Sequence, residues 1–265
     1  MRPNLVKRRL AQDLPVLGTM CSLASPLMAE SLGHAGYDFL IVDLQHGESN
    51  LGNVAAMLQA VSSTAASPIV RVPDASPLHI QRVLDLGAYG VVVPMVETRA
   101  QAEAVVHSVR YAPHGQRSWG PIRGALYGGA DYFSGSPATL LTLAMIETAR
   151  GLANVDEIVA VEGIDGCFIG PNDLSISLGF PPEQLALPSE VEAAIARIAA
   201  AARAAGKSAG IQVYSAAAAR LRFDAGFRFV SVQSDIRMAR AAAAELVGGL
   251  RGSRPPSRAV EKEEE

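Results

Sequence analysis

The stretch that decides the fold is residues 140–173, which read LLTLAMIETARGLANVDEIVAVEGIDGCFIGPND. It contains an apolar run over 140–147, a segment of helical period over 151–161 and a second apolar run over 166–170. Glycine in the phrase VEGIDG is typical of a helix that ends in the left-handed conformation before a strand. Both apolar runs lack polar alternation, which indicates parallel strands covered by helices. The stretch therefore predicts one strand–helix–strand unit.

The same unit repeats along the chain, and the phrases LGHAGYDF, LDLGAYGV and RFDAGFRF also end a helical segment with glycine. The predicted strands are 16–22, 39–44, 68–72, 90–96, 140–147, 166–170, 208–213 and 227–232. The predicted helices are 26–35, 51–63, 77–87, 98–109, 151–161, 188–205, 215–225 and 235–248. Eight such units favour an α/β fold of the (β/α)8 TIM-barrel type over a doubly wound open sheet. The Gly-rich segment 111–139 is predicted as a long functional loop.

Composition excludes several classes of protein. The 265 residues carry a net charge of −3, so the basic excess of a nucleic-acid-binding domain is missing. Cys21 and Cys167 lie far apart, which favours a cytoplasmic protein without a disulfide framework. No secretory h-region or membrane-length apolar run occurs, so no membrane partner is expected. We expect one barrel domain over 1–252 and a disordered charged tail over 253–265.

In a TIM barrel, catalytic groups gather at the C-terminal ends of the strands. The polar residues predicted there are Asp43, Gln45, His46, Arg71, Glu97, Glu147, Asn172, Asp173, Gln212 and Gln233. The chain's lysines, Lys7, Lys207 and Lys262, are not in this set, and Lys207 precedes a strand at the opposite end. A Schiff-base aldolase needs a lysine in its site, so that mechanism is not expected.

Two carboxylates follow neighbouring predicted strands. Glu147 and Asp173 would form a site of hard oxygen ligands, which suits Mg²⁺ or Mn²⁺. The alternative is that each acid caps the helix after it. Glu97 lies in PMVET, which echoes AMIET around Glu147, and is a third candidate acid for which a helix-start role is favoured.

Arg71 and His46 are the candidate groups for substrate chemistry. An arginine at a strand end needs an anionic partner, and that partner is either a substrate oxyanion or one of Glu147 and Asp43. Asp43, three residues before His46, would hold one ring nitrogen and leave the other as a general base. The alternative is a structural histidine bonded to Asp43.

Several phrases resemble the HpcH/HpaI aldolase family, the metal-dependent class II pyruvate aldolases that include 4-hydroxy-2-oxoheptanedioate aldolase and 2-dehydro-3-deoxyglucarate aldolase. The likeness covers nearly the whole folded chain, and its phrases are AGYDFLIVDLQHGE, PIVRVP, LDLGAYGVVVPMVET, AMIETARGLANVDEIVAVEGIDGCFIGPNDLSISLG and AAGKSAGI. The resemblance implies a single-domain barrel of the phosphoenolpyruvate/pyruvate type. It implies reversible cleavage of 4-hydroxy-2-oxo acids to pyruvate and an aldehyde through a metal-stabilised enolate. It also implies a cytoplasmic homo-oligomer, a trimer or a hexamer with an exchanged C-terminal helix.

The resemblance assigns roles to matching positions. Glu147 and Asp173 would be the protein ligands of a divalent metal, Mg²⁺, Mn²⁺ or Co²⁺. Arg71 would steady the ketone oxygen as it becomes an enolate. His46 would be the base, with Asp43 as its partner.

The remaining matched positions concern substrate binding. Gly170 and Pro171 would shape the pyruvate pocket, with Asn172 and Gln212 towards the aldehyde. Many family members read D-x-E-H where this chain has DLQH, so Gln45 removes a carboxylate beside the base. Asn172 and Gln212 also depart from the family pattern and make the aldehyde end more polar, which leaves the aldehyde open.

Two other readings are weaker. A citryl- or malyl-CoA lyase relative, or an oxo-acid decarboxylase on the same scaffold, would share the site, but a CoA enzyme should show a nucleotide-binding extension or a basic patch, and neither is seen. A non-catalytic barrel that binds a small acid should lack one of His46, Arg71, Glu147 and Asp173, yet all four are present.

Overall fold

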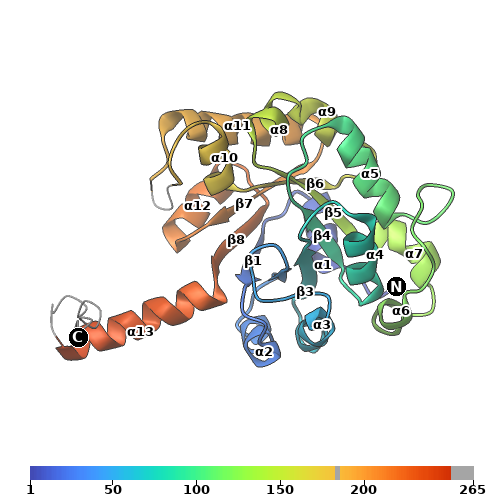
Figure 1. Ribbon diagram of the computed structural model, residues 1–265, viewed down its shortest axis with the longest axis horizontal. Helices are drawn as coiled ribbons and strands as arrows, with labels where there is room; N and C mark the ends of the chain where they lie inside the picture. The colour runs from blue at the N-terminus through green and yellow to red at the C-terminus, as the bar shows by residue number, and fades with distance from the viewer. Residues whose placement is uncertain (183–185, 252–265) are drawn as a thin grey trace, which may run out of the picture.

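In the computed structural model, which describes residues 1–182 and 186–251, eight parallel strands form a closed barrel surrounded by helices (Figure 1). The strands are β1 Val16–Cys21, β2 Phe39–Asp43, β3 Ser67–Arg71, β4 Gly90–Val93, β5 Leu141–Ile146, β6 Gly166–Ile169, β7 Ser208–Val213 and β8 Phe229–Ser234. β1 pairs with β8, with Val16 opposite Phe229, which closes the barrel and excludes an open sheet. The predicted single-domain TIM barrel is confirmed, whereas the predicted tail 253–265 lies outside the described residues.

Thirteen helices occur among the described residues. They are α1 Leu5–Ala11, α2 Pro26–His34, α3 Val54–Ser62, α4 Pro77–Asp85, α5 Arg99–Val109, α6 Ile122–Gly128, α7 Tyr132–Thr139, α8 Ala149–Ala153, α9 Val155–Val159, α10 Pro171–Ser177, α11 Ser189–Ala204, α12 Ala216–Asp224 and α13 Asp235–Arg251. None of these helices combines the length and apolarity that crossing a bilayer requires.

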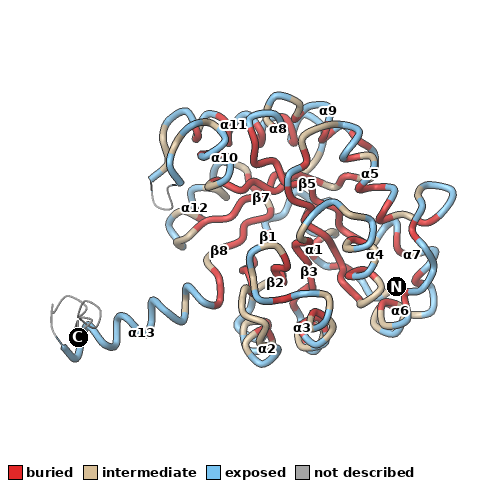
Figure 2. The backbone as a smooth tube through the Cα atoms, in the orientation of Figure 1, coloured by how far each residue is buried: buried red, intermediate tan, exposed pale blue. Residues whose placement is uncertain are grey.

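Two apolar cores hold the barrel, and both follow from strands that are buried along their length (Figure 2). One core lies between the strands and the outer helices, and the other fills the barrel interior. In the interior, the rings of Phe39 and Phe229 stack with centroids 3.9 Å apart. Gly18 makes room for them, because a Cβ there would lie 2.2 Å from the Phe39 ring.

The glycines that the sequence marked as helix ends adopt the expected conformation. Gly36, Gly87, Gly163 and Gly226 have φ angles of 100°, 97°, 95° and 92°. A side chain is disfavoured at such angles, which explains why one residue type recurs before the strands. Each of these glycines ends a helix at a fixed residue, which sets the length of the connection to the next strand.

Some elements differ from the prediction. The expected loop 111–139 contains α6 and α7. Its aromatic rings pack on one another, and the ring centroids of Tyr111 and Phe133 lie 5.2 Å apart. The expected helix 151–161 is two short helices, α8 and α9, that meet at Asn154. The helices α1 and α10 were not predicted, because seven-residue helices give too few turns for a visible period.

Candidate functional site

A cavity of about 310 Å³ opens among the C-terminal ends of the strands. All of the residues predicted to act in catalysis, substrate binding or metal binding line it except Glu147, whose Oε2 lies beside the lining residue Gly170. The lining comprises Met20, Ser22, Asp43, His46, Arg71, Met145, Phe168, Gly170, Pro171, Asn172, Asp173, Gln212, Tyr214, Gln233, Ser234, Ile236 and Arg237. The cavity therefore brings the predicted residues together at the barrel end where such folds carry their chemistry.

Asp43 and Arg71 form a buried ion pair on adjacent strands. The register of β2 and β3 places the two residues opposite each other. The guanidinium of Arg71 donates from Nε and Nη2 to the two carboxylate oxygens of Asp43, over 2.8 and 2.6 Å. Of the partners that the sequence left open for Arg71, the structure shows Asp43. This two-point contact fixes the plane of the guanidinium at the cavity wall.

His46 does not make the ring contact that was expected with Asp43. Asp43 Oδ1 instead accepts from the backbone N–H groups of Gln45 and His46, over 3.0 and 3.3 Å, and the carboxylate is otherwise engaged by Arg71. Asp43 thus shapes the turn after β2, and the exposed His46 ring reaches the cavity from that turn without a hydrogen bond among the described residues. The following Gly47 is required, because a Cβ there would lie 2.4 Å from the Asp43 carbonyl oxygen.

Glu147 is 1% exposed and keeps one carboxylate oxygen without a partner among the described residues. Its Oε1 accepts from the backbone N–H of Met95 over 2.9 Å, whereas Oε2 is buried and unbonded. The pKa of Glu147 is raised to about 7, by burial above all and also by the nearby charge of Asp173, while the N–H of Met95 and the charge of Arg71 act in the opposite direction. Such an atom is costly to bury unless something binds it.

The backbone around Glu147 is arranged to receive it. Met95 has a φ of 57°, a strained angle for a residue with a side chain, and its N–H points at the carboxylate. Gly170 follows β6 beside Glu147, and a Cβ there would lie 2.5 Å from Glu147 Oε2. Glycine at this position therefore keeps the space around the unbonded oxygen clear.

Neither acid acts as the helix cap that was the alternative. Thr148 caps α8 by accepting from Gly151 N, so Glu147 is not the capping residue. Asp173 lies in the first turn of α10, is exposed, and makes no capping bond. Glu97 lies directly before Thr98, the N-cap of α5, and its carboxylate accepts from the hydroxyl of Thr148, the N-cap of α8, over 2.9 Å.

Two carboxylates are the protein groups available for a cation at this end. Among residues 1–182 and 186–251, no group of three or more His, Cys, Asp and Glu side chains is placed to hold a metal ion. Glu147 and Asp173 fit a hard cation nonetheless, because Glu147 offers an unbonded buried oxygen beside Gly170 of the cavity lining, and Asp173 offers an exposed carboxylate in that lining. Such a site would leave most coordination positions to water and substrate.

The opposite wall of the cavity is polar and carries further unbonded atoms. Asn172 Nδ2 donates to the hydroxyl of Tyr214 over 3.2 Å, and Gln212 Nε2 donates to the carbonyl of Gln233 over 2.9 Å. The amide oxygens of Asn172 and Gln212 are buried without a partner among the described residues. Gln233 has a φ of 64°, so this wall also stores backbone strain.

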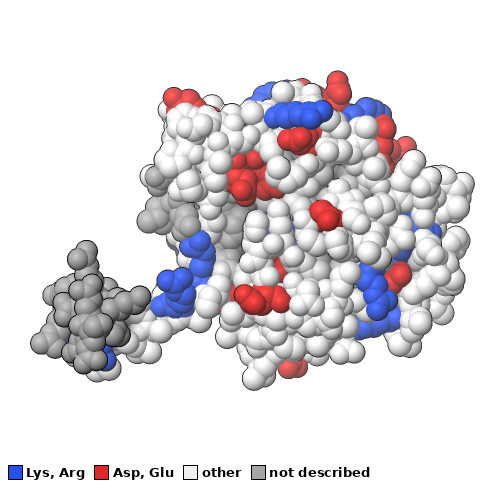
Figure 3. All heavy atoms as spheres, in the orientation of Figure 1, with Lys and Arg blue, Asp and Glu red and all other residues white. Residues whose placement is uncertain are grey.

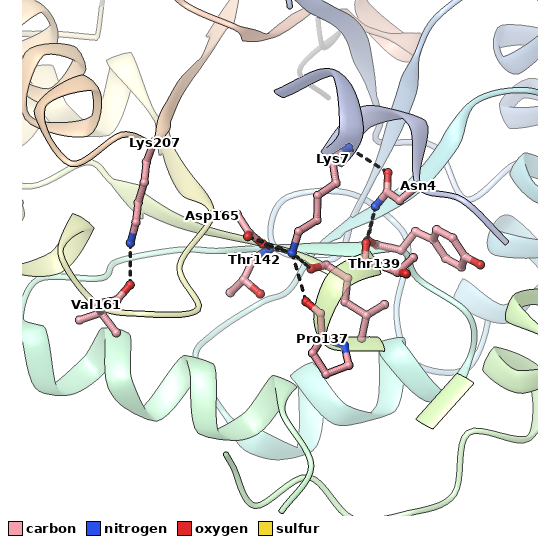
Figure 4. Close-up of polar contacts among 10 residues, drawn as sticks. Asn4, Lys7, Pro137, Thr139, Thr142, Val161, Asp165 and Lys207 are labelled. Carbon is pink, nitrogen blue, oxygen red and sulfur yellow. Dashed lines mark hydrogen bonds and ion pairs between the residues drawn. The ribbon is translucent and has the colours of Figure 1, made fainter. Parts of the chain in front are cut away.

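Both described lysines, Lys7 and Lys207, lie at the other end of the barrel, as was predicted for Lys207, and Figure 4 shows their contacts. Lys7 donates to Asp165 and to the carbonyl oxygens of Leu140 and Pro137, and Lys207 donates to the carbonyl of Val161. Lys7 lines a cavity of about 700 Å³ that is larger than the one described above but holds none of the predicted site residues. Lys262 lies outside the described residues.

Sequence reasoning missed three contributors to the site. Met95 acts through its backbone, Tyr214 follows β7 by one residue, and Arg237 lies in the first turn of α13. Tyr214 and Arg237 could have been found, because both lie within three residues of a strand's C-terminal end. The role of Met95 depends on a φ angle and gave no signal in the sequence.

The chain is similar along most of its length to known proteins of one family. The family model described as HpcH/HpaI aldolase/citrate lyase matches residues 17–242. A hydroxypyruvate/pyruvate aldolase of Rhizorhabdus wittichii is 41% identical over 94% of this chain and 99% of its own. A 5-keto-4-deoxy-D-glucarate aldolase of Klebsiella pneumoniae is 38% identical over 94% and 97%. The crystal structure of a family protein from Burkholderia cenocepacia has a TM-score of 0.88 and 35% identity, covering 94% of this chain and all of that one.

Proposed function

The chain belongs to the HpcH/HpaI aldolase/citrate lyase family, and we propose that it is a divalent-metal-dependent aldolase that cleaves 4-hydroxy-2-oxo acids reversibly into pyruvate and an aldehyde. The chain is a carbon–carbon lyase of the class II pyruvate aldolases, and our proposal concerns its substrate. The observation that carries the proposal is the unbonded, buried Oε2 of Glu147, which lies beside Gly170 of the cavity lining and near enough to Asp173 and Arg71 for their charges to shift its pKa.

Glu147 and Asp173 would hold the metal ion, with Mg²⁺, Mn²⁺ and Co²⁺ as candidates. A cation would stabilise the ionised form of Glu147, which burial alone disfavours. When bound, the ion supplies a positive charge and open positions for the oxygens of a 2-oxo acid. Gly170 and Pro171, at the start of α10, bound the space for the three-carbon part of the substrate.

Arg71 and His46 would carry the chemistry on the protein's side. Cleavage of the bond between C3 and C4 leaves negative charge on the 2-oxo group, and the guanidinium of Arg71 is already oriented by Asp43 to stabilise it. His46 would take the proton from the 4-hydroxyl group, since its ring reaches the cavity without a competing hydrogen bond among the described residues. Asp43 is thus a positioning residue, for the arginine and for the turn that carries the histidine.

Self-association would follow from the shape of α13. This helix projects from the barrel and is exposed along most of its length (Figures 1 and 2). Leu246 and Leu250 on it are 70% and 88% exposed, which is a large apolar surface for a monomer. We propose that α13 packs on a second copy in a homo-oligomer, a trimer or a hexamer. Leu246→Glu with Leu250→Glu should lower the mass measured by light scattering, and an unchanged mass would contradict the packing.

The test of the proposed function is pyruvate release from 4-hydroxy-2-oxo acids, before and after treatment with EDTA. We expect loss of activity on chelation and recovery with Mg²⁺, Mn²⁺ or Co²⁺. Full activity in EDTA would refute the metal-dependent mechanism. Borohydride added with pyruvate should trap no adduct, because both described lysines are at the far end of the barrel; a covalent adduct would point to a lysine mechanism.

A further inference from the structure

A buried carboxylate that the proposed reaction does not use lies at the start of α13. Asp235 directly follows β8 and is 1% exposed, although the surface where α13 leaves the barrel carries basic side chains in the space-filling view (Figure 3). Its Oδ1 accepts from the backbone N–H groups of Ser22 and Ile236, over 2.9 and 2.8 Å, and its Oδ2 accepts from that of Leu23 over 3.0 Å. A carboxylate accepts stronger hydrogen bonds than a neutral oxygen does, so Asp235 holds the backbone after β1 firmly.

The backbone after β1 is bonded in its turn to the loop that carries His46. The backbone N–H of Glu48 donates to the carbonyl oxygen of Ser22 over 2.8 Å. The two segments also pack closely at Gly47, because a Cβ there would lie 2.9 Å from the same carbonyl oxygen. Ser22 and His46 both line the cavity at the C-terminal ends of the strands. The residues after β1 therefore support the loop that presents the histidine ring.

A single peptide group makes both contacts. The carbonyl of Ser22 and the N–H of Leu23 belong to one trans peptide unit, which is planar and directs the two groups to opposite sides. Asp235 accepts from this N–H, and Glu48 donates to this carbonyl. Because the plane is rigid, the bond to Asp235 fixes the direction of the carbonyl that holds the His46 loop, and each bond polarises the peptide for the other.

The position of the His46 ring depends on the backbone that carries it. The ring makes no hydrogen bond among the described residues, so nothing else of that kind orients it. Asp43 accepts from the N–H of His46 within the loop, and Asp235 acts from outside it, through the backbone after β1. A displacement of about 1 Å in a reacting group can lower a rate about 10²-fold, so support of this kind affects catalysis.

We propose that Asp235 is a positioning residue for His46, acting through the peptide between Ser22 and Leu23. This inference rests on the proposed aldolase function and adds to it a residue that aligns the base with the 4-hydroxyl group. The same contact links α13, the helix proposed to pack on a second copy, to the loop of the base. Loss of the Asp235 carboxylate should therefore impair proton removal from the 4-hydroxyl group more than stabilisation of the enolate.

The experiment compares two reactions that break the bond between C3 and C4 of a 2-oxo acid. Cleavage of 4-hydroxy-2-oxopentanoate needs a base for the 4-hydroxyl proton, whereas decarboxylation of oxaloacetate releases CO₂ and leaves the same enolate with no such proton to remove. The measured quantity is the ratio of the two kcat values with Mn²⁺ present. Asp235→Asn keeps the shape of the side chain but turns a donor towards a backbone N–H. We expect the ratio to fall about 10- to 100-fold, with decarboxylation as the reference for folding and metal binding.

A double-variant cycle shows whether the effect passes through the histidine. His46→Ala should lower the same ratio at least as far as Asp235→Asn does, and the double variant should lower it no further than His46→Ala alone. Asp38→Asn is the matched control, because Asp38 accepts from the backbone N–H of Leu17 over 2.8 Å, near the start of β1 at the opposite end of the barrel. This control should keep the wild-type ratio.

The outcomes separate this inference from the proposed function. If the metal-loaded wild type cleaves the 4-hydroxy acid but Asp235→Asn keeps the wild-type ratio, or slows both reactions equally, Asp235 does not position the base. A ratio that falls further in the double variant than in His46→Ala would show that Asp235 acts independently of His46 and would also overturn the inference. If the metal-loaded wild type releases no pyruvate from any 4-hydroxy-2-oxo acid, the aldolase proposal itself fails.

Discussion

At the N-terminal end of the barrel the ammonium of Lys7 donates to three oxygens, whereas at the C-terminal end Glu147 buries an oxygen that has no hydrogen-bond partner among the described residues. Lys7 and Asp165 tie α1 to the connection before β6, so the charge there holds elements together. At the C-terminal end, Met95 and Gln233 have strained backbone angles, and the amide oxygens of Asn172 and Gln212 have no hydrogen-bond partner among the described residues. The difference indicates which end is built for stability and which for a ligand.

The largest expected effect is on the unbonded carboxylate. Glu147→Gln should lower kcat/KM for pyruvate release about 10³-fold or more, because it removes the charge of the proposed metal ligand from a buried position. Mn²⁺ binding, measured by calorimetry, should be lost, while the melting temperature is kept or raised, since a buried charge is removed.

Glu97→Gln is the matched control for that variant, because Glu97 occupies the same place in PMVET that Glu147 occupies in AMIET. The Glu97 carboxylate accepts from the Thr148 hydroxyl, whereas Oε2 of Glu147 has no hydrogen-bond partner among the described residues. Activity and Mn²⁺ affinity should stay close to wild type. Equal losses in both variants would make Glu97 a third ligand and remove the contrast between the two acids.

The next largest effect is on the base. His46→Ala should slow cleavage by about 10²- to 10⁴-fold, the range for loss of a general base. Pyruvate affinity, measured by calorimetry with Mn²⁺ present, should change little, because the histidine acts at the aldehyde half. A variant that loses pyruvate affinity and cleavage in parallel would make His46 a binding residue.

The pH dependence of the free energy of unfolding should reveal the raised pKa of the buried Glu147 carboxyl. The folded pKa of Glu147 is about 7, above the ordinary value of 4.5, so the folded metal-free protein binds an extra proton between these values. Its contribution to stability is therefore full below about pH 4.5 and is lost as the pH rises through 7. Relative to Glu147→Gln, metal-free wild type should lose up to about 3 kcal/mol over this range in urea unfolding. Parallel curves for the two proteins would show that the carboxyl titrates normally.

At the N-terminal end of the barrel we expect the opposite result, a loss of stability without a loss of activity. Lys7→Met should lower the free energy of unfolding by about 1–3 kcal/mol, because Asp165 and two carbonyl oxygens lose a charged donor, while kcat stays at the wild-type value. Lys207→Met removes a single bond to a carbonyl and should cost less. If Lys7→Met abolished activity without loss of stability, the division of labour between the ends would be wrong.

The sequence predicted which residues lie at the C-terminal end of the barrel better than it predicted the contacts between their side chains. Strand ends follow from apolar runs and the glycines before them, so Asp43, Arg71, Asp173 and Gln212 were placed correctly at one rim. The contact of Asp43 with the His46 ring, which spacing along the chain favoured, is not made. The contact with Arg71, one of the partners that the sequence left open, follows from the register of β2 and β3. Contacts that depend on strand register, or on a left-handed backbone conformation such as that of Met95, cannot be predicted from a local sequence pattern.

The smallest effect concerns the polar wall, where an unbonded atom serves selectivity. Gln212→Leu should shift the preference from glyceraldehyde towards propanal by about three- to tenfold in kcat/KM, because a hydroxyl loses an acceptor and an alkyl group gains a contact. The melting temperature should fall slightly, since the carbonyl of Gln233 loses its donor. The two aldehydes serve as controls for each other, so a general loss of activity cancels in the ratio. An unchanged ratio would place the Gln212 amide outside the aldehyde site and assign it to holding β7 against β8, which would make this wall resemble the N-terminal end of the barrel.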